Sequence, residues 1–322
     1  MKGYSRLGLV AVALAVAVVA SVSVGEVSVP PIEVVKSLLF AGTDYDLIVR
    51  ELRWPRTVLA VVTGAAFGIG GALIQSVTRN PLASPDIIGI TQGAGLAATI
   101  ALTTGVIAVA PAALAGGLLA ALLVFTFGSR SGFSARRFVL AGVAVAFALR
   151  AGIEVVLTSA ETIDAQRAQI WLIGSLNGRG FTEASAIALT LVLALGPLLW
   201  AGWALRTSAL DDDVARGLGV RPVARRYGLA AVGVVLAAAA TAQVGAIDFV
   251  ALVAPQVARR ILRTERPGLL ASALVGATLV VLADLAGRRL LAPTQLPAGV
   301  LTAALGAPYL IYLLLRGRRH AA

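Results

Sequence analysis

Residues able to do acid–base or nucleophilic chemistry are few in this chain and lie far apart. It contains no cysteine, its one histidine is His320, and its one methionine is Met1. Three carboxylates, Glu154, Asp248 and Asp284, fall within separate apolar stretches. Thiolate and imidazole metal sites and His or Met haem ligation are therefore excluded, and the scattered acidic residues predict no metal site. We expect no catalytic residues on this chain.

Nucleotide hydrolysis would also need residues that the chain lacks. A phosphate-binding loop of the G-x-x-x-x-G-K-[ST] type requires a lysine. The chain has only Lys2 and Lys36, and neither lies in such a loop. If ATP drives this protein, another subunit must bind the ATP and Mg, and this chain binds no cofactor.

Two charged pairs lie at helical spacing in or near apolar stretches. Arg150 and Glu154 are four residues apart, so on a helix they share a face. Charged groups at membrane depth are costly and usually face a water-filled cavity or the bundle interior. This pair therefore either lines a pathway for a polar solute or is neutralised as an ion pair. Asp284 and Arg288, near the end of a stretch, indicate helix-end electrostatics instead.

The composition predicts the environment of these residues. Of 322 residues, 58% are hydrophobic and 13% are charged, against about 25% charged residues in soluble domains. This predicts an all-α polytopic membrane protein in contact with lipid, with one transmembrane domain over residues 1–322. The net charge is +11, but the arginines lie in short loops between apolar stretches. They indicate orientation in the membrane, not nucleic-acid binding.

Ten apolar stretches approach the length of about 20 residues that a helix needs to span a bilayer core. They are Leu7–Val24, Thr57–Val77, Ile87–Ile107, Ala112–Phe127, Phe138–Leu157, Thr182–Trp203, Tyr227–Ala242, Ala246–Ile261, Leu269–Leu285 and Pro297–Leu315. We interpret the first as a retained helix, with a cleaved signal peptide as the alternative. Ten spans place both termini on one side, and the excess of Lys and Arg in the resulting inner segments predicts that this side is cytoplasmic.

The second stretch and the loop after it have the most distinctive pattern. Thr57–Val77 carries no charge, and its Gly64 and Gly68 are four residues apart, which allows another helix to approach closely. Pro81 and Pro85 in the following T-R-N-P-L-A-S-P-D segment interrupt regular helix. That segment is either a loop that closes a pore or a simple connection between helices.

Two further segments outside the spans are expected to be helical. Pro31–Phe40 begins with proline and has apolar residues at helical spacing, which suits a connecting helix or an amphipathic helix on the outer surface. A short cytoplasmic helix is expected at about residues 209–219. Asp211–Asp213 suit its N-terminal end, and Gly217 or Gly219 suits its termination.

Nine stretches of the chain form a distinctive ordered set. They are R-W-P-R at Arg53–Arg56, G-G-A-L-I-Q at Gly70–Gln75, N-P-L-A-S-P at Asn80–Pro85, L-A-G-V-A at Leu140–Ala144, W-L-I-G-S-L-N at Trp171–Asn177, D-D-V-A-R-G-L-G-V at Asp212–Val220, F-V-A-L-V-A-P at Phe249–Pro255, L-A-D at Leu282–Asp284 and L-P-A-G-V-L-T-A-A-L-G-A-P at Leu296–Pro308. In this order they resemble the FecCD family, the permease subunits of ABC importers for ferric siderophores, haem and cobalamin.

The resemblance implies the ten-helix architecture of a type II ABC importer permease. Such a subunit dimerises, as a homodimer or with a paralogue, around a central pathway. Two cytoplasmic ABC ATPase subunits and an extracytoplasmic solute-binding protein complete the importer. ATP binding and hydrolysis on the ATPase would shift the permease between inward-open and outward-open states.

Site residues are implied by the same resemblance. Asn80 and Leu82 match residues that close the cytoplasmic end of the pathway. Arg53 and Arg56, with Arg288 as a third, match arginines that dock on carboxylates of the binding protein, where charge complementarity sets encounter rate and orientation. The segment that couples the permease to a groove on the ATPase matches Asp211, Asp212, Asp213, Val214, Ala215, Arg216 and Leu218.

The chain departs from the family pattern in the eighth predicted span, Ala246–Ile261. Asp248 stands where a small residue is usual, Ala251 replaces Gly, and Gln256 stands where His is common, so the roles of Asp248 and Gln256 are open. W-L-I-G-S-L-N followed by Arg179 and Gly180 favours a ferric siderophore as the solute.

Alternatives to this function are a haem or cobalamin importer and an ion-coupled secondary transporter. In the second, Arg150, Glu154 and Asp248 would form the coupling relay and no ATPase would be needed. A structural or receptor-like membrane protein is a further alternative.

Overall fold

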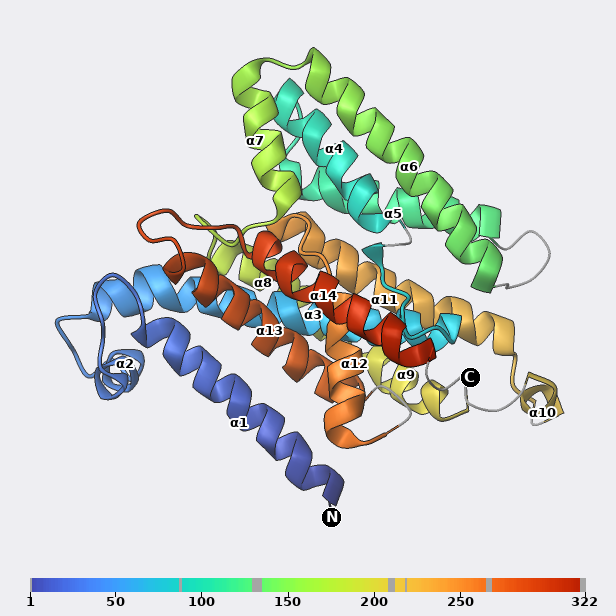
Figure 1. The fold of residues 1–322 in the computed structure, drawn as a ribbon, viewed down its shortest axis with the longest axis horizontal. Coiled ribbons are helices and arrows are strands. Elements are labelled where there is room, and N and C mark those ends of the chain that lie inside the picture. Colours follow the sequence, from blue (N-terminus) through green and yellow to red (C-terminus); the bar gives the residue numbers. More distant parts are fainter. Residues whose placement is uncertain are drawn as a thin grey trace.

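A computed structural model describes residues 2–86, 89–128, 135–207, 212–217, 219–264 and 268–318. Within these residues the regular structure is helical, as the composition predicts (Figure 1). The elements are α1 (Lys2–Ser23), α2 (Pro31–Leu38), the π-helix η1 (Leu47–Arg53), α3 (Trp54–Thr78), α4 (Ile90–Thr104), α5 (Val109–Gly128), α6 (Ala135–Ser159), α7 (Thr162–Ile173), α8 (Phe181–Leu193), α9 (Leu195–Thr207), α10 (Asp212–Gly217), α11 (Pro222–Val244), α12 (Val250–Leu262), α13 (Leu269–Arg289) and α14 (Ala298–Arg318).

Each of the ten predicted spans coincides with helical structure, but the lengths differ. Six helices of the described residues are long and apolar enough to cross a membrane, and the bent pair α8 and α9 makes seven if it counts as one span. The break between α8 and α9 bends the chain by 53°. The other three predicted spans correspond to α4, α12 and α14. Of these, α4 has 15 residues and α12 has 13, because non-helical segments precede both.

Helix α3 lies at the centre of the bundle and packs against α8, α11, α12 and α13. Its side chains Leu59, Phe67, Leu73 and Ile74 are fully buried in the largest core cluster. A helix that is apolar on all sides and surrounded by other helices is the expected centre of a membrane bundle. The uncharged stretch predicted from the sequence is therefore the structural core.

Glycines of α3 allow its neighbours to approach the backbone. A Cβ atom on Gly68 would overlap the carbonyl of Ser272 on α13, and one on Gly71 would overlap the carbonyl of Ala251 on α12. Gly64 likewise faces Gly276 of α13. This confirms the close helix packing predicted from the glycine spacing, and it explains how α3 contacts four helices at once.

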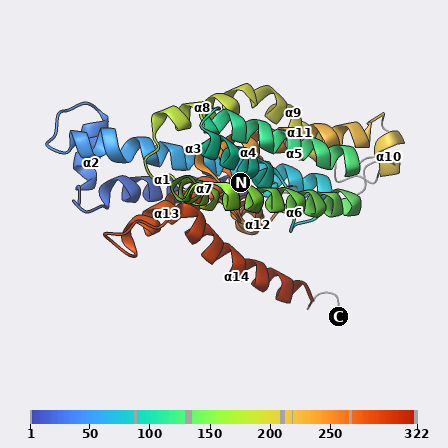
Figure 2. The same cartoon turned by 90° about the horizontal axis from the view of Figure 1, so that it is seen from above.

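Helices α4, α5, α6 and α7 form a second group, which joins the central helices mainly through α5 and α11. In Figure 1 this group lies along the upper side of the bundle. In Figure 2, α14 diverges from the bundle toward its C-terminal end. Helices α2 and α10 lie at opposite ends of the long axis in both views. The predicted helix at Pro31–Phe40 is α2, and it packs on α1 and η1.

Candidate functional site

At the η1 end of α3, three charged side chains form what we call the Asp284 cluster: Arg56, Asp284 and Arg288. The Nε of Arg56 donates to both carboxylate oxygens of Asp284, at 3.0 and 3.1 Å, and its Nη2 donates to Oδ1 at 2.8 Å. The Nε of Arg288 lies 3.1 Å from Oδ2 of Asp284. The Asp284 side chain is 1% exposed and those of Arg56 and Arg288 are 12% and 11% exposed. The cluster is therefore a nearly buried ion network.

The remaining donors of this cluster join segments that are far apart in the sequence. Nη1 of Arg56 donates to Oδ1 of Asn177 at 3.2 Å and to Oε1 of Gln295 at 3.1 Å. Nη2 of Arg288 donates to the Ser21 carbonyl at 3.1 Å and to its hydroxyl at 2.8 Å. The cluster thus ties α1, α3, α13 and two loops together. The predicted Asp284–Arg288 pairing is confirmed, while the pairing with Arg56 was not predicted.

Arg53 has a different environment from the other two arginines expected to dock a partner. It is 8% exposed, and its guanidinium donates to the carbonyls of Val22, Ser23 and Val27 at 2.8, 3.2 and 2.6 Å. These donors satisfy carbonyls that the end of α1 leaves without helical partners. Arg53 therefore anchors the C-terminal end of α1. The exposed arginine of this region is Arg289, whose Nη1 donates to the Gly25 carbonyl at 2.8 Å.

Three backbone segments cross closely: one follows α7, one lies at the C-terminal end of α11, and one lies at the start of α14. The Ser175 amide donates to the Val244 carbonyl at 2.9 Å, and the Gly299 amide donates to the Gly174 carbonyl at 3.1 Å. Gly174 and Gly245 have φ values of +78° and +79°, which residues with a Cβ adopt only at a cost. Gly174 and Gly299 belong to two of the nine sequence stretches noted above, and the close crossing at these positions is the spatial reason for their glycines.

The Asn80–Pro85 loop lies at the opposite end of α3 from the Asp284 cluster. Helix α3 ends at Arg79, which has a left-handed φ of 50°. Oδ1 of Asn80 accepts the Leu82 amide at 2.9 Å, and the Asn80 carbonyl accepts the Ala83 amide at 3.2 Å. Such Asx turns hold a short loop in one conformation. The predicted break in helix is confirmed, and both Asn80 and Leu82 are half-buried.

Asp86 follows this loop in a polar pocket of its own. Its Oδ1 accepts the Thr91 hydroxyl at 2.9 Å. The Ser84 side chain also hydrogen-bonds to Asp86, and the carboxylate of Asp248 lies close enough to interact with it electrostatically. The sequence indicated Asp248 as an unusual charge, but the carboxylate that faces it across the fold was not predicted.

Arg150 and Glu154 lie on the exposed side of α6. Neither makes an ion pair with the other or with another charged group among the described residues. The alternative in which the two neutralise each other within the bundle is therefore wrong for this chain, because both side chains point away from it. Helix α6 also exposes Leu140, Phe147 and Val155, so its outer face is mixed, with charges among apolar side chains.

The expected helix at about residues 209–219 is α10, which spans Asp212–Gly217. Asp211 and Leu218 lie outside the described residues. Asp213 and Val214 are exposed, Ala215 is buried, and Arg216 pairs with Asp213 at 2.6 Å. Gly219 has a φ of +75°, and the Val220 amide donates to the Ala215 carbonyl at 3.0 Å. This confirms the predicted termination by glycine, and Figure 1 shows α10 at the edge of the bundle.

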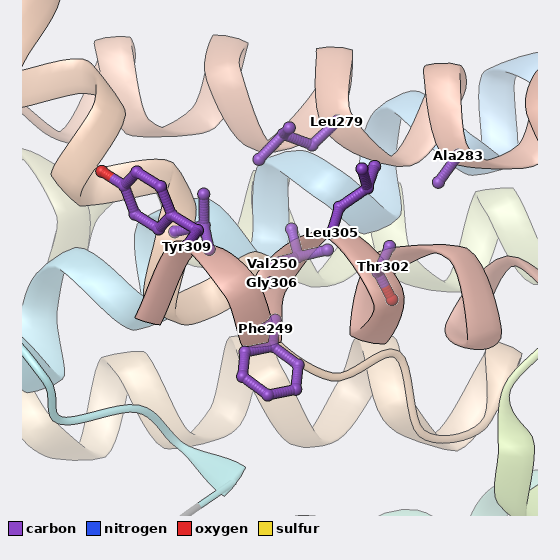
Figure 3. Close-up of a pocket in the computed structure, with 9 residues that line it drawn as sticks. Phe249, Val250, Leu279, Ala283, Thr302, Leu305, Gly306 and Tyr309 are labelled. Atoms are coloured by element: carbon purple, nitrogen blue, oxygen red, sulfur yellow. The ribbon is translucent and has the colours of Figure 1, made fainter. Parts of the chain in front are cut away.

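An apolar cavity of about 240 Å³ separates α14 from α12 and α13. Figure 3 shows Phe249 beneath Gly306 and the ring of Tyr309 at the other side of the cavity. Phe249 begins α12 with a left-handed φ of 66°. Polar groups in the wall are the hydroxyls of Thr302 and Tyr309. The packing of α14 on the bundle is therefore loose at this level.

These features define a class of protein. A glycine-packed bundle of apolar helices, six of them long enough to cross a membrane among the described residues, describes a polytopic membrane protein. Among the described residues, no group of three or more His, Cys, Asp or Glu side chains is placed to hold a metal ion. The chain belongs to the FecCD transport family, whose model matches residues 13–316.

Sequence relatives agree with this family. The chain is 39% identical to the achromobactin transport system permease protein CbrC of Dickeya dadantii, over 97% of this chain and 92% of that protein. It is 41% identical to the ferric enterobactin transport system permease protein FepG of Escherichia coli, over 85% of this chain and 84% of that protein. The resemblance drawn from the nine stretches is confirmed.

A solved structure has the same fold. The chain superposes on a metal-chelate-type ABC transporter in an inward-facing conformation with a TM-score of 0.84. The match covers 97% of this chain and 99% of that chain, at 26% sequence identity. The helical architecture is thus that of an ABC transporter permease.

Proposed function

We propose that this chain is the membrane-spanning permease of a binding-protein-dependent ABC importer and moves a ferric-siderophore complex into the cytoplasm. The observation that carries the proposal is the near full-length similarity to permeases named for achromobactin and ferric enterobactin. ATP and Mg bind to a separate ATPase subunit, and the permease moves the solute without covalent chemistry. The absence of a P-loop lysine in the sequence supports this division of labour.

We further propose that the chain crosses the inner membrane ten times, with both termini in the cytoplasm. Helices α4 and α12 are shorter than a span, but buried residues outside the helices precede both, Ala83 and Ser84 before α4 and Ala246 and Ile247 before α12, and these segments complete the crossings. Non-helical backbone at membrane depth is tolerated where protein covers it. The distribution of arginines supports the orientation.

Helix α10 is the proposed contact with the ATPase. Its exposed Val214 and Asp213 offer one apolar and one charged side chain to a groove on that subunit, while buried Ala215 fixes the helix to its own chain. Residues Asp211 and Leu218 complete the proposed coupling segment. A short helix that is anchored to its own chain can dock in a groove of a partner as a rigid unit.

The end of the molecule with the Asp284 cluster is the proposed docking site for the solute-binding protein. Arg56 and Arg288 each keep about a tenth of their side chains exposed, and the exposed Arg289 adds a cation beside them. Arg53 contributes mainly by holding the end of α1 in place, as its carbonyl contacts indicate. Docking through cations that are already positioned favours orientation and rate of encounter.

The outer face of α6 is the proposed lining of the pathway, completed by a second permease subunit. Exposed Arg150 and Glu154 are too costly to face lipid tails, so a water-filled space or a partner chain must cover them. Glu154→Gln tests this role: we expect an altered uptake rate or solute preference, and unaltered uptake would remove Glu154 from the pathway.

Uptake into proteoliposomes tests the function as a whole. Ferric siderophores, haem and cobalamin are offered in parallel to the permease assembled with its ATPase and binding protein. We expect uptake of a ferric siderophore. Uptake of haem or cobalamin alone would change the solute. Uptake that an ionophore abolishes and a Walker-motif mutation in the ATPase leaves unchanged would favour an ion-coupled transporter.

A further inference from the structure

Two glutamines form a polar contact inside the apolar core of the bundle. Gln75 on α3 is 3% exposed and Gln256 on α12 is 6% exposed. The Nε2 of Gln256 donates to Oε1 of Gln75 at 3.0 Å, and the Nε2 of Gln75 donates to the Leu252 carbonyl at 3.0 Å. A buried amide without partners costs free energy, so the position of each glutamine depends on the other.

Gln256 also reaches the Asn80–Pro85 loop. Its Nε2 donates to the Pro81 carbonyl. The two N–H groups of this amide are therefore engaged by acceptors on α3 and on the loop. The opposite amide orientation would place the Gln256 oxygen against two other oxygens, so the hydrogen-bond network fixes which way the amide points.

Helix α12 is well placed to move the loop through this contact. It begins at Val250, shortly after the segment whose Ala246 carbonyl packs against Gly174, and its Gln256 reaches the loop. Pro255 lies inside α12 and supplies no amide hydrogen. Next to it, Gln256 directs its side-chain donors away from its own helix, to α3 and the loop.

We propose that Gln75 and Gln256 form a glutamine clasp that positions the Asn80–Pro85 loop and couples its movement to α12. Gln256 is the positioning residue that holds Pro81, and Gln75 holds Gln256. This inference rests on the proposed function, in which the loop closes the cytoplasmic end of the pathway. The clasp itself is a contact within one chain and does not depend on the identity of the solute.

The first test measures hydrogen exchange at the Leu82 and Ala83 amides in the purified permease. Gln256→Leu keeps the size of the side chain and removes both donors, while Gln256→His keeps a ring N–H. Gln166→Leu, at an exposed position on α7, is the matched control. We expect exchange at least tenfold faster in Gln256→Leu, partial recovery in Gln256→His and no change in the control. Unchanged exchange in Gln256→Leu overturns the clasp.

The second test measures coupling in proteoliposomes as ATP hydrolysed per solute taken up. We expect Gln256→Leu to raise this ratio severalfold, because a loop released from α12 closes the pathway poorly. Faster exchange at Leu82 with an unchanged ratio overturns the role of the clasp in gating. If the unmodified permease takes up no solute although its loop amides are protected and depend on Gln256, the proposed function fails and the clasp stands.

Discussion

Replacing Asp284 by asparagine removes the counter-charge of two nearly buried guanidinium groups. Asp284 accepts three hydrogen bonds from Arg56 and pairs with Arg288 at 3.1 Å. Removing one partner of a buried ion pair typically costs about 3–5 kcal/mol. Because Arg56 and Arg288 are each about one-tenth exposed, water reduces the penalty, and we expect the free energy of unfolding to fall by about 3 kcal/mol.

Asp164 provides the matched control for that substitution. It pairs with Arg167 at 3.3 Å, but there the Arg167 side chain is 67% exposed and the Asp164 side chain 28% exposed. Exposed pairs contribute about 0–1 kcal/mol. Unfolding of Asp284→Asn, Asp164→Asn and the unmodified permease would be compared by titration with a denaturing detergent in mixed micelles. Equal stability of the two variants would refute the conclusion that the Asp284 cluster holds the helices together.

Two further experiments test the packing of α3 and the role of α10. Gly68→Ala should destabilise the protein by about 1–3 kcal/mol, because the new Cβ overlaps the Ser272 carbonyl. Gly202→Ala is the control and should not destabilise it, because the space around Gly202 is open. Equal melting temperatures of the two variants would contradict the close packing of α3. Glycine at each position of Asp212–Val214 should leave ATP hydrolysis in place and reduce uptake at least tenfold; retained uptake would remove α10 from coupling.

Features that depend on neighbouring residues in the sequence were predictable. The positions of the ten helical stretches follow from runs of apolar residues, and the glycine spacing of Gly64 and Gly68 predicts a closely packed face. The termination of α10 at Gly219 and the Asp284–Arg288 pair follow from helical geometry alone. Each of these depends only on residues that are close together in the sequence.

Features that join distant segments were not predictable from one sequence. Arg56 lies 228 positions from Asp284, and Gln75 lies 181 positions from Gln256. Spacing along the chain gives no information on such contacts. Arg53 is an instructive case: the family resemblance implies a docking residue, while the fold places its guanidinium on the carbonyls at the end of α1.

The most direct measurement of the central proposal is uptake of a ferric siderophore into proteoliposomes that contain this permease, its ATPase and its binding protein. The proposal predicts that uptake requires ATP on the side of the membrane where the ATPase lies. It also predicts that uptake stops when the Walker-motif lysine of the ATPase is replaced. Uptake that continues with the inactive ATPase, or failure of the permease to assemble with any ABC ATPase, would contradict it.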